Sequence, residues 1–410
     1  MKIRSITVFC NPSWPLDDRL LEQAGKFIQG ARPAFEAAGF EVQTTRLATP
    51  PFPGWLSGIA ARELVQIAQS LEAAARGMKF DYLSLGPALP EVPDSFAAIP
   101  DILASTQVTF LGGVIADRER GISLPAVRAC AQVIRHTSVV TPDGFANLRF
   151  AALANVPAGA PFFPAAYHQG QGMGFALALE AADLAVEAIE AADSLEAARR
   201  RLIESVEAHA GRLGAVAGQL DGLCSVKFGG IDFSLAPYPE EARSLGAAIE
   251  RLGVPSVGLH GSLAAAALIT EALDRARFQR AGFSGLMLPV LEDAVLARRA
   301  AEGQLDVIDL LLYSAVCGTG LDTIPLPGDT PLEALAALLL DLATLSSRLD
   351  KPLTARLMPI PGKQAGDPTG FDFAYFANSR VLALKAGALG GLCAGDETFH
   401  LGMRLSSNVL

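Results

Sequence analysis

The segment KIRSITVFCNPSWPLDDRLLEQAGKFIQGARPAFEAAGFEVQTTRL, residues 2–47, decides the fold class. Apolar and β-branched residues predict a strand over residues 3–9, and a turn follows it. Residues 18–38 predict a helix that an aspartate caps, and residues 40–47 predict a second strand. A strand, a helix and a strand in this order are typical of the βαβ unit of an α/β protein.

The rest of the chain continues this alternation of short apolar runs with helical segments. We predict further strands at 82–85, 108–111, 148–153, 284–289 and 353–358. We predict further helices at 61–77, 123–136, 174–192, 195–219, 241–252, 262–279, 303–315 and 331–348. Since neither a linker nor a repeat interrupts the pattern, we expect residues 1–410 to form one large α/β domain. A three-layer sandwich or a two-lobed α/β protein would fit the same pattern.

The composition excludes several classes of protein. Of the 410 residues, 50% are hydrophobic and only 19% are charged, which excludes a disordered chain. The formal net charge of −10 argues against a nucleic-acid partner, which requires a basic face. The five cysteines are scattered without a CxxC pair, and no apolar stretch reaches the ~18–20 residues of a membrane span. We expect a cytoplasmic protein with no membrane partner, and the sequence leaves a homo-oligomer open.

Four segments differ in composition from the Ala- and Leu-rich helical parts of the chain, because they are dense in glycine, proline and polar residues. They are KFGGIDFSLAP (227–237), GFSGLMLPVLED (282–293), YSAVCGTGLDTIPLPGDT (313–330) and KPLTARLMPIPGKQAGDPTGFDF (351–373). Polar loops beside strands commonly carry binding and catalytic groups, although such residues can also serve only as turns. We predict that the four segments converge on one cavity.

These segments, together with NLRFAALANVPAGAPFFPAAYH (147–168), resemble the UPF0210 family, also called the domain of unknown function 711 family. The resemblance covers nearly the whole chain. It implies an α/β fold similar to the pyruvate formate-lyase and ribonucleotide-reductase superfamily, a single ten-stranded α/β barrel of two parallel half-sheets. In that superfamily a cysteine-bearing finger loop enters the barrel. The resemblance implies no particular reaction.

One departure from that superfamily excludes glycyl-radical chemistry. Its radical enzymes carry a glycine near the C-terminus in an Arg-Val-x-Gly context. The nearest match in this chain is Arg380-Val381-Leu382-Ala383, with alanine at the radical position. We therefore retain from the resemblance only the barrel.

Cys317 is the leading candidate for a reactive group. It lies in Val-Cys-Gly-Thr-Gly, where Gly318 and Gly320 allow close backbone approach and could offer N–H groups to a substrate. A thiol with a lowered pKa could act there as a nucleophile or a soft ligand. The alternative is a buried, unreactive thiol, which is a common fate of free cysteine.

Carboxylates and histidines in or near the same segments are candidates for acid–base work. Asp232 and Asp322 could act as general acid and base, and together with Glu292 they could hold a divalent cation. Asp232 lies in an apolar run, where its charge needs a partner. His168 and His260 lie beside glycine or proline loops and could also transfer protons. Each of these residues could instead be a structural cap, turn or hydrogen-bonding group.

Three cations form a candidate clamp for an anion. Arg356 lies within the apolar strand predicted at 353–358, where an unpaired guanidinium would be costly. Lys363 follows in a glycine-rich loop, and Lys227 lies close to Asp232 in the sequence. A bound anion would explain this set, and a salt bridge from Arg356 to Asp322 or to Asp372 would explain that arginine nearly as well.

From these residues we predict an enzyme that acts on a small, polar, anionic metabolite inside a barrel. No organic cofactor is indicated, and a divalent metal is compatible with the carboxylates. The alternative is a non-catalytic metabolite-binding or regulatory protein that uses the same pocket. The two differ in that an enzyme needs a titratable group of perturbed pKa beside the binding groups.

Overall fold

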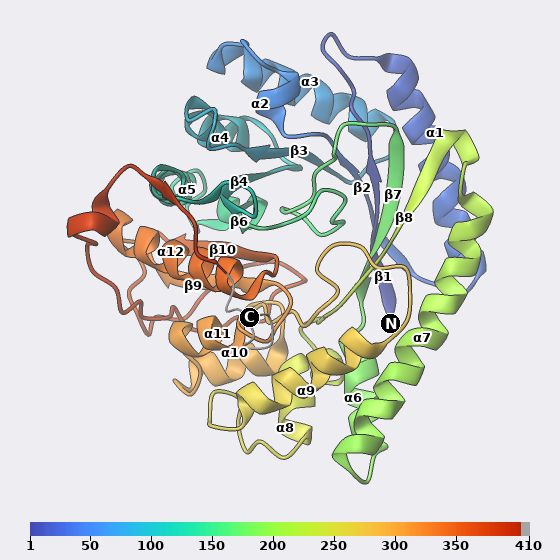
Figure 1. The fold of residues 1–410 in the computed structure, drawn as a ribbon, viewed down its shortest axis with the longest axis vertical. Coiled ribbons are helices and arrows are strands. Elements are labelled where there is room, and N and C mark those ends of the chain that lie inside the picture. The colour runs from blue at the N-terminus through green and yellow to red at the C-terminus, as the bar shows by residue number, and fades with distance from the viewer. Residues whose placement is uncertain (403–410) are drawn as a thin grey trace, which may run out of the picture.

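The computed structural model describes residues 1–402, and one mixed sheet forms its centre (Figure 1). Its strands are β1 (Lys2–Phe9), β2 (Val42–Ala48), β3 (Tyr82–Ala88), β4 (Thr109–Asp117), β5 (Gly121–Ser123), β6 (Phe150–Ala154), β7 (Met173–Glu180), β8 (Val226–Ala236), β9 (Gly320–Pro327), β10 (Leu353–Ile360) and β11 (Thr398–Phe399). Its α-helices are α1 (Asp18–Ala37), α2 (Phe52–Trp55), α3 (Ala61–Gly77), α4 (Asp94–Ser105), α5 (Leu124–Thr137), α6 (Ala182–Glu190), α7 (Leu195–Leu220), α8 (Leu245–Arg251), α9 (Ser262–Arg275), α10 (Ala294–Ala301), α11 (Val307–Tyr313) and α12 (Leu332–Leu349).

The strand order is β8-β7-β1-β2-β3-β4-β6-β10-β9, with β5 paired to β4 and β11 to β5. β1, β2, β3, β4 and β6 form a parallel block. β7 runs antiparallel to β1 and carries β8 parallel to itself, while β10 runs antiparallel to β6 and carries β9 parallel to itself. The sheet is therefore a five-stranded parallel block with an oppositely directed parallel pair at each edge.

The segment 279–291 lies between the two edge strands. It forms an isolated parallel bridge to β8, between Arg280 and Ile231, and another to β9, between Pro289 and Asp322. The strand pairings of residues 1–402 nevertheless give an open sheet of eleven strands. The predicted α/β class is confirmed, and the ten-stranded closed barrel is not.

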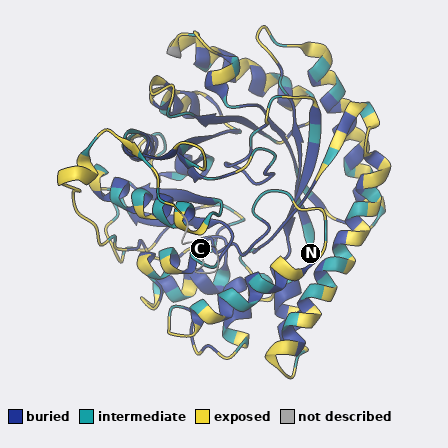
Figure 2. Ribbon diagram, in the orientation of Figure 1, coloured by how far each residue is buried: buried dark blue, intermediate teal, exposed yellow. Residues whose placement is uncertain are grey.

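Helices cover the sheet on its outer side, which explains why most strand positions are buried. Parallel strands packed on both faces read as continuous apolar runs, and β10 is buried at every position. Figure 2 shows the strands as buried and the helices with one exposed side. The helices thus provide the solvated surface and the strands provide the core.

Most predicted elements are confirmed, and two are wrong. The helices predicted at 18–38 and 331–348 match α1 and α12, and the strand predicted at 353–358 matches β10. Residues 174–192 do not form one helix, because their first part is β7, a fully paired strand between β1 and β8, and only the second part is α6. The strand predicted at 284–289 is reduced to the single bridge at Pro289.

The loop from β6 to β7, residues 155–172, lies against the sheet. The hydroxyl of Thr7 on β1 donates to the Pro161 carbonyl at 2.9 Å, and the hydroxyl of Ser84 on β3 donates to the Ala166 carbonyl at 2.7 Å. Residues 160–166 are buried throughout. The resemblance implied a cysteine on a loop that enters the fold, but this buried loop contains none.

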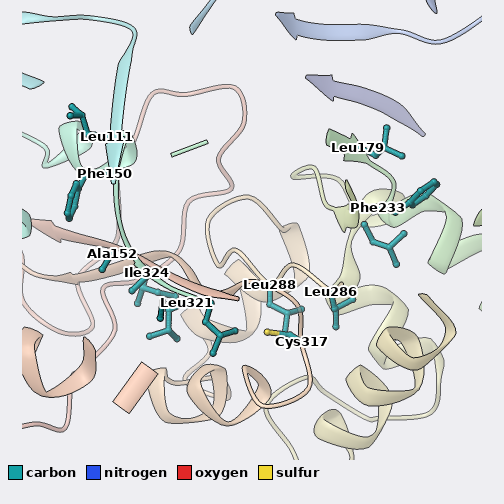
Figure 3. Packing of buried hydrophobic residues seen from close by; sticks show 14 of the residues in the cluster. Leu111, Phe150, Ala152, Leu179, Phe233, Leu286, Leu288, Cys317, Leu321 and Ile324 are labelled. Atoms are coloured by element: carbon teal, nitrogen blue, oxygen red, sulfur yellow. The ribbon is translucent and has the colours of Figure 1, made fainter. Parts of the chain in front are cut away.

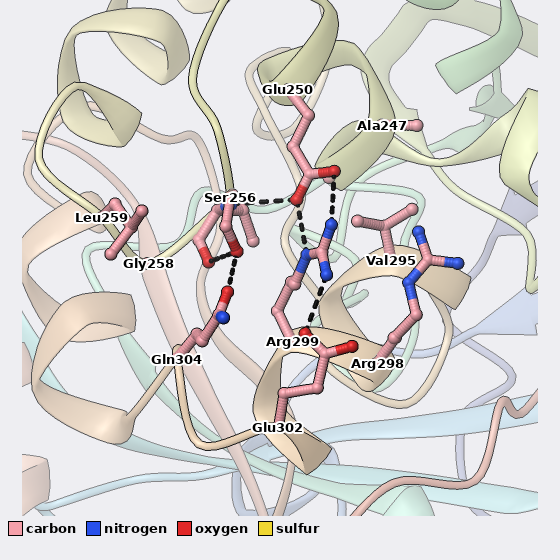
Figure 4. Close-up of polar contacts among 12 residues, drawn as sticks. Ala247, Glu250, Ser256, Gly258, Leu259, Val295, Arg298, Arg299, Glu302 and Gln304 are labelled. Carbon is pink, nitrogen blue, oxygen red and sulfur yellow. Dashed lines mark hydrogen bonds and ion pairs between the residues drawn. The ribbon is translucent and has the colours of Figure 1, made fainter.

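An ion-pair network on the outer side holds α8 to α10, and we call Glu250, Arg299 and Glu302 the outer network (Figure 4). The guanidinium of Arg299 donates to both Glu250 oxygens, at 2.7 and 3.0 Å, and to Glu302 at 2.7 Å. The pKa of Glu250 is lowered because hydrogen bonds from Arg299 and the Val257 N–H outweigh the effect of burial. Each charge in this network has a partner.

Candidate functional site

A cavity of about 80 Å³ opens beside β1, β2, β9 and β10. Its charged lining consists of Arg4, Arg46, Glu292, Asp322 and Arg356. Four of these residues come from strands, and Glu292 directly follows segment 279–291. The fold thus brings together charged side chains that lie far apart in the sequence.

Most of these charges form a chain of ion pairs, which we call the inner network: Asp322, Arg356, Glu292, Arg4 and Glu180. The Arg356 guanidinium donates to Asp322 Oδ1 at 2.5 Å and to Glu292 Oε1 at 2.6 Å. Arg4 donates to Glu292 Oε2 at 2.5 Å and to Glu180 Oε2 at 3.2 Å. Both oxygens of Glu292 are therefore occupied by arginines.

Arg46 differs from the other two arginines because it has no carboxylate partner. Its side chain is buried, and its Nε donates to the Thr44 hydroxyl at 3.0 Å. Its guanidinium lies 5.5 Å from the ring centre of Tyr82 and 5.1 Å from that of Phe163. Among residues 1–402, no carboxylate lies within 4.0 Å of it. Burial, with repulsion from Arg4 next, lowers the pKa of Arg46 to about 10, so it stays charged at neutral pH.

Asp322 lines the cavity, and a side chain holds only one of its two carboxylate oxygens. Oδ1 accepts from Arg356, whereas Oδ2 has no partner among the side chains of residues 1–402. Burial raises the pKa of Asp322, although the charge of Arg356 opposes this effect. The Thr323 N–H also interacts with this carboxylate, but no side chain of residues 1–402 holds Oδ2. A carboxylate with a raised pKa and an oxygen that no side chain holds can exchange a proton with a bound molecule.

The cavity has aromatic walls. Phe110 lies with its ring centre 5.2 Å from Tyr82 and 5.3 Å from Phe163, both edge-on. On the opposite side, Arg4 lies 5.0 Å from the ring centre of Tyr375. The buried loop contributes Phe162 and Phe163, so the β6–β7 connection helps to form the site.

Three of the four glycine- and proline-rich segments reach this cavity. Segment 282–293 contributes Met287 and Glu292, segment 313–330 contributes Asp322, and segment 351–373 contributes Arg356. Segment 227–237 does not line the cavity. Arg356 forms the salt bridge to Asp322 that the sequence left as an alternative to a bound anion.

Cys317 lies outside the cavity, in the core between α11 and β9. Figure 3 shows its sulfur among Leu286, Leu288 and Leu321, and its exposed fraction is 1%. Its carbonyl accepts a hydrogen bond from the half-buried ammonium group of Lys351. The structure therefore surrounds this thiol with packed side chains.

The two glycines beside Cys317 serve close backbone packing. A Cβ added to Gly318 would lie 2.5 Å from the Gly285 Cα. Gly320 has φ +95°, and an added Cβ would lie 2.4 Å from the Thr354 carbonyl oxygen. Neither glycine lines the cavity beside Arg46.

Asp232 holds segment 279–291 to β8. Its buried carboxylate accepts from the N–H groups of Phe283, at 2.7 Å, and Ser284, at 2.8 Å, and from the Ser234 hydroxyl at 2.5 Å. Burial raises the pKa of Asp232 to about 6, although these hydrogen bonds oppose the shift. Asp232 is therefore separate from Asp322 and does not line the cavity.

The remaining candidates lie elsewhere. His168 and Lys227 line a second cavity of about 490 Å³, where the His168 imidazole contacts the Gly172 carbonyl at 2.9 Å. Burial lowers the pKa of His168. His260 is exposed and Lys363 is half-buried, and neither lines either of these two cavities. The cation clamp predicted from Arg356, Lys363 and Lys227 is thus not brought together at one place.

The sequence contained a signal for the residues that were missed. Arg4 and Arg46 also lie within predicted strands, at 3–9 and 40–47, so the same argument about buried cations applies to them. Nothing in the sequence distinguished Tyr82 and Tyr375 from core aromatics. Their role follows only from the position of the cavity.

The described residues offer no ready metal centre. Within residues 1–402, no group of three or more His, Cys, Asp or Glu side chains is arranged to hold a metal ion. Of the candidates Asp232, Glu292 and Asp322, the last two lie together, but Arg356 stands between them as a shared partner. Among the same residues, no helix has the length and apolar character needed to cross a membrane.

Fold and site together define an α/β protein with a buried cavity that combines paired charges, one unpaired arginine and aromatic walls. The model of the family described as "Uncharacterised ACR (DUF711)" matches residues 1–374. The chain is 35% identical over 394 residues to a UPF0210 protein of Pyrobaculum islandicum, covering 90% of this chain and 85% of that protein. It is 31% identical over 374 residues to a UPF0210 protein of Methanopyrus kandleri, covering 85% and 81%. The chain belongs to this uncharacterised family, as its motifs predicted.

Proposed function

We propose that this protein is an enzyme that binds a small anionic metabolite beside Arg46 and exchanges a proton with it through Asp322. The observation that carries the proposal is the unpaired, buried guanidinium of Arg46 at the wall of a cavity. An uncompensated buried charge is costly, so a site of this kind is better explained by a ligand that supplies the opposite charge.

We further propose that segment 279–291 closes the sheet into the barrel. With it, β7, β8, β9 and β10 would form a second parallel block of five strands, matching the five of β1, β2, β3, β4 and β6. The bridges at Arg280 and Pro289, one to each edge strand, support this arrangement. The cavity would then lie inside one barrel, beside the first half of β9 and of β10, where Asp322 and Arg356 lie.

The roles of the charged groups follow from their contacts. The outer nitrogens of Arg46 are available to hold an anionic group, since its Nε alone is engaged by Thr44. Glu292 is unsuited to proton transfer because both its oxygens are held by arginines. Asp322 keeps Oδ2 available, so in this proposal a proton passes between the ligand and that oxygen. Cys317 has no role in the reaction.

Ligand binding is tested by thermal stability with inorganic phosphate and simple carboxylates as probes. A probe at about 100 times its Kd should stabilise the protein by ~2.7 kcal/mol. We expect Arg46→Met to lose this stabilisation. The matched control is Arg212→Met, because Arg212 also stacks on an aromatic ring, Phe40 at 4.7 Å, but on the exposed surface. Equal stabilisation of both variants would overturn the binding proposal.

Catalysis is tested separately by hydrogen–deuterium exchange into a bound probe. A small oxo-carboxylate with an acidic C–H bond would lose its proton to Asp322 and regain a deuteron from D₂O, which NMR detects. We expect Asp322→Asn to bind the probe and to lose exchange. Binding by the wild type without exchange of any probe would instead identify the non-catalytic metabolite-binding protein.

A further inference from the structure

We infer that the ligand is a short monocarboxylate with an apolar body; this rests on the proposed function and narrows it to one substrate class. Three independent features of the cavity lead to this class. They are its charge balance, its aromatic walls and its size.

The charge balance favours a single negative charge. The lining has three arginines, Arg4, Arg46 and Arg356, and two carboxylates, Glu292 and Asp322, which leaves one positive charge. The inner network continues outward through Glu180 to Arg243 at 2.7 Å, one charge of each sign, and ends at the exposed carboxylate of Glu240, so the balance of the buried charges is unchanged. One anionic group on Arg46 neutralises the site, whereas a second would be buried without a partner.

The shape of the free donor favours a carboxylate. A guanidinium offers a planar pair of N–H groups that matches the two oxygens of a carboxylate. A phosphate group, which carries about −1.5 to −2 charges near pH 7, would exceed the single positive charge available. The carboxylate is therefore the group that fits Arg46 in both geometry and charge.

The walls beside Arg46 favour an apolar remainder. Tyr82, Phe110 and Phe163 form one edge-to-face group around the guanidinium, and Phe162 and Met287 continue the apolar lining. Such walls stabilise CH₂ groups and offer a second charged group no partner. The body of the ligand should therefore be hydrocarbon.

The size of the cavity limits the length of that body. About 80 Å³ is open to the centres of water molecules, which corresponds to roughly five to eight water-sized groups at ~10–15 Å³ each. A carboxylate and a chain of about three or four carbons would fill this space. Butanoate and pentanoate are the simplest probes of this size.

The test is calorimetric titration of the full chain with acetate, propanoate, butanoate and pentanoate, and with succinate and inorganic phosphate. We expect affinity to rise roughly fourfold per CH₂ up to the length that fills the cavity. Succinate should bind at least tenfold more weakly than butanoate. Arg46→Met should abolish binding of all members of the series.

A matched pair of variants separates the apolar contact from the anion contact. Phe110→Leu shortens a wall that Arg46 does not stack on, so it should reduce the gain per CH₂ and leave acetate binding unchanged. The control is Phe27→Leu, because Phe27 is similarly buried against the ring of Phe175 and neither residue lines this cavity. Equal effects of the two variants on butanoate would contradict the apolar assignment.

The outcomes distinguish failure of the two proposals. Stronger binding of succinate or phosphate than of butanoate, lost in Arg46→Met, would overturn the monocarboxylate and leave the anion site standing. Binding of butanoate that Arg46→Met does not weaken would overturn the proposed function itself. No binding of any probe would overturn both.

Discussion

The inner and outer networks use the same residue types in different ways. In the outer network, Arg299 is 19% exposed and is paired with Glu250 of the neighbouring helix α8 and with Glu302 at the end of its own helix α10. In the inner network, Arg356 is 10% exposed and is paired in the same manner, but an additional arginine, Arg46, stands beside the network without a carboxylate. Arginines that are fully paired with carboxylates can be explained by a structural role. The unpaired charge of Arg46 in the interior cannot be explained in this way.

The two networks also differ in what burial costs them. Charges taken out of water lose several kcal/mol of hydration each, and their mutual attraction recovers this only with good geometry. The outer pairs keep part of their hydration, so each contributes little. The inner pairs depend on one another, because removing one partner leaves an uncompensated charge in the interior.

Glu292→Gln is the change with the largest expected effect on stability. It gives the clearest contrast between the inner and the outer network. It leaves Arg4 and Arg356 each without one carboxylate contact, and we expect it to lower the free energy of unfolding by about 3–5 kcal/mol. Glu250→Gln, the matched change in the outer network, should cost about 1 kcal/mol. Urea denaturation of both variants measures the difference. Similar losses in the two variants would show that burial does not distinguish the networks.

The second expected effect concerns Asp232, a buried carboxylate held by N–H groups and a hydroxyl rather than by an arginine. Its pKa is about 6 in the folded protein and 3.8 as the ordinary value. Between these values the folded state retains a proton that the unfolded state loses, so this group's contribution to stability falls as pH rises. The fall should amount to about 2 kcal/mol between pH 4 and pH 6.5.

Asp232→Asn removes this titration. Because other groups titrate in the same range, the measured quantity is the unfolding free energy of the wild type minus that of Asp232→Asn at each pH. This difference should decrease by about 2 kcal/mol from pH 4 to pH 6.5. A difference that stays constant, or that increases, would mean that Asp232 is not the group with the raised pKa.

The fold class could be predicted because periodicity and turn residues act locally. The strand at 353–358 and the helix at 331–348 were found for this reason. The strand β7 was missed because its alanine, leucine and glutamate residues favour a helix, and its strand conformation depends on pairing with β1 and β8 on both sides. Nor could segment 279–291 be assigned, since its two bridges join strands distant in the sequence.

The site could be predicted only in part for the same physical reason. Asp322 and Glu292 were singled out as carboxylates in the glycine- and proline-rich segments, and Arg356 as a charge in an apolar strand, and the structure brings these three together. Cys317 was singled out from its glycine neighbours, which instead allow close backbone packing. Arg46 carries the same signal as Arg356, but its lack of a partner depends on tertiary contacts that no local pattern contains.

The smallest expected effect on stability is that of Arg46→Met. It tests most directly whether Arg46 differs from the paired arginines of the two networks. Removing a paired arginine from a buried network is costly, but removing Arg46 also removes an uncompensated buried charge. Loss of its contacts with Tyr82 and Phe163 costs about 0.5–1 kcal/mol each and offsets that gain. We therefore expect the free energy of unfolding to change by less than about 1 kcal/mol, as measured by urea denaturation in a buffer without carboxylates or phosphate. A loss of more than about 2 kcal/mol would mean that Arg46 stabilises the fold as the arginines of both networks do, and the argument for a ligand at this position would fail.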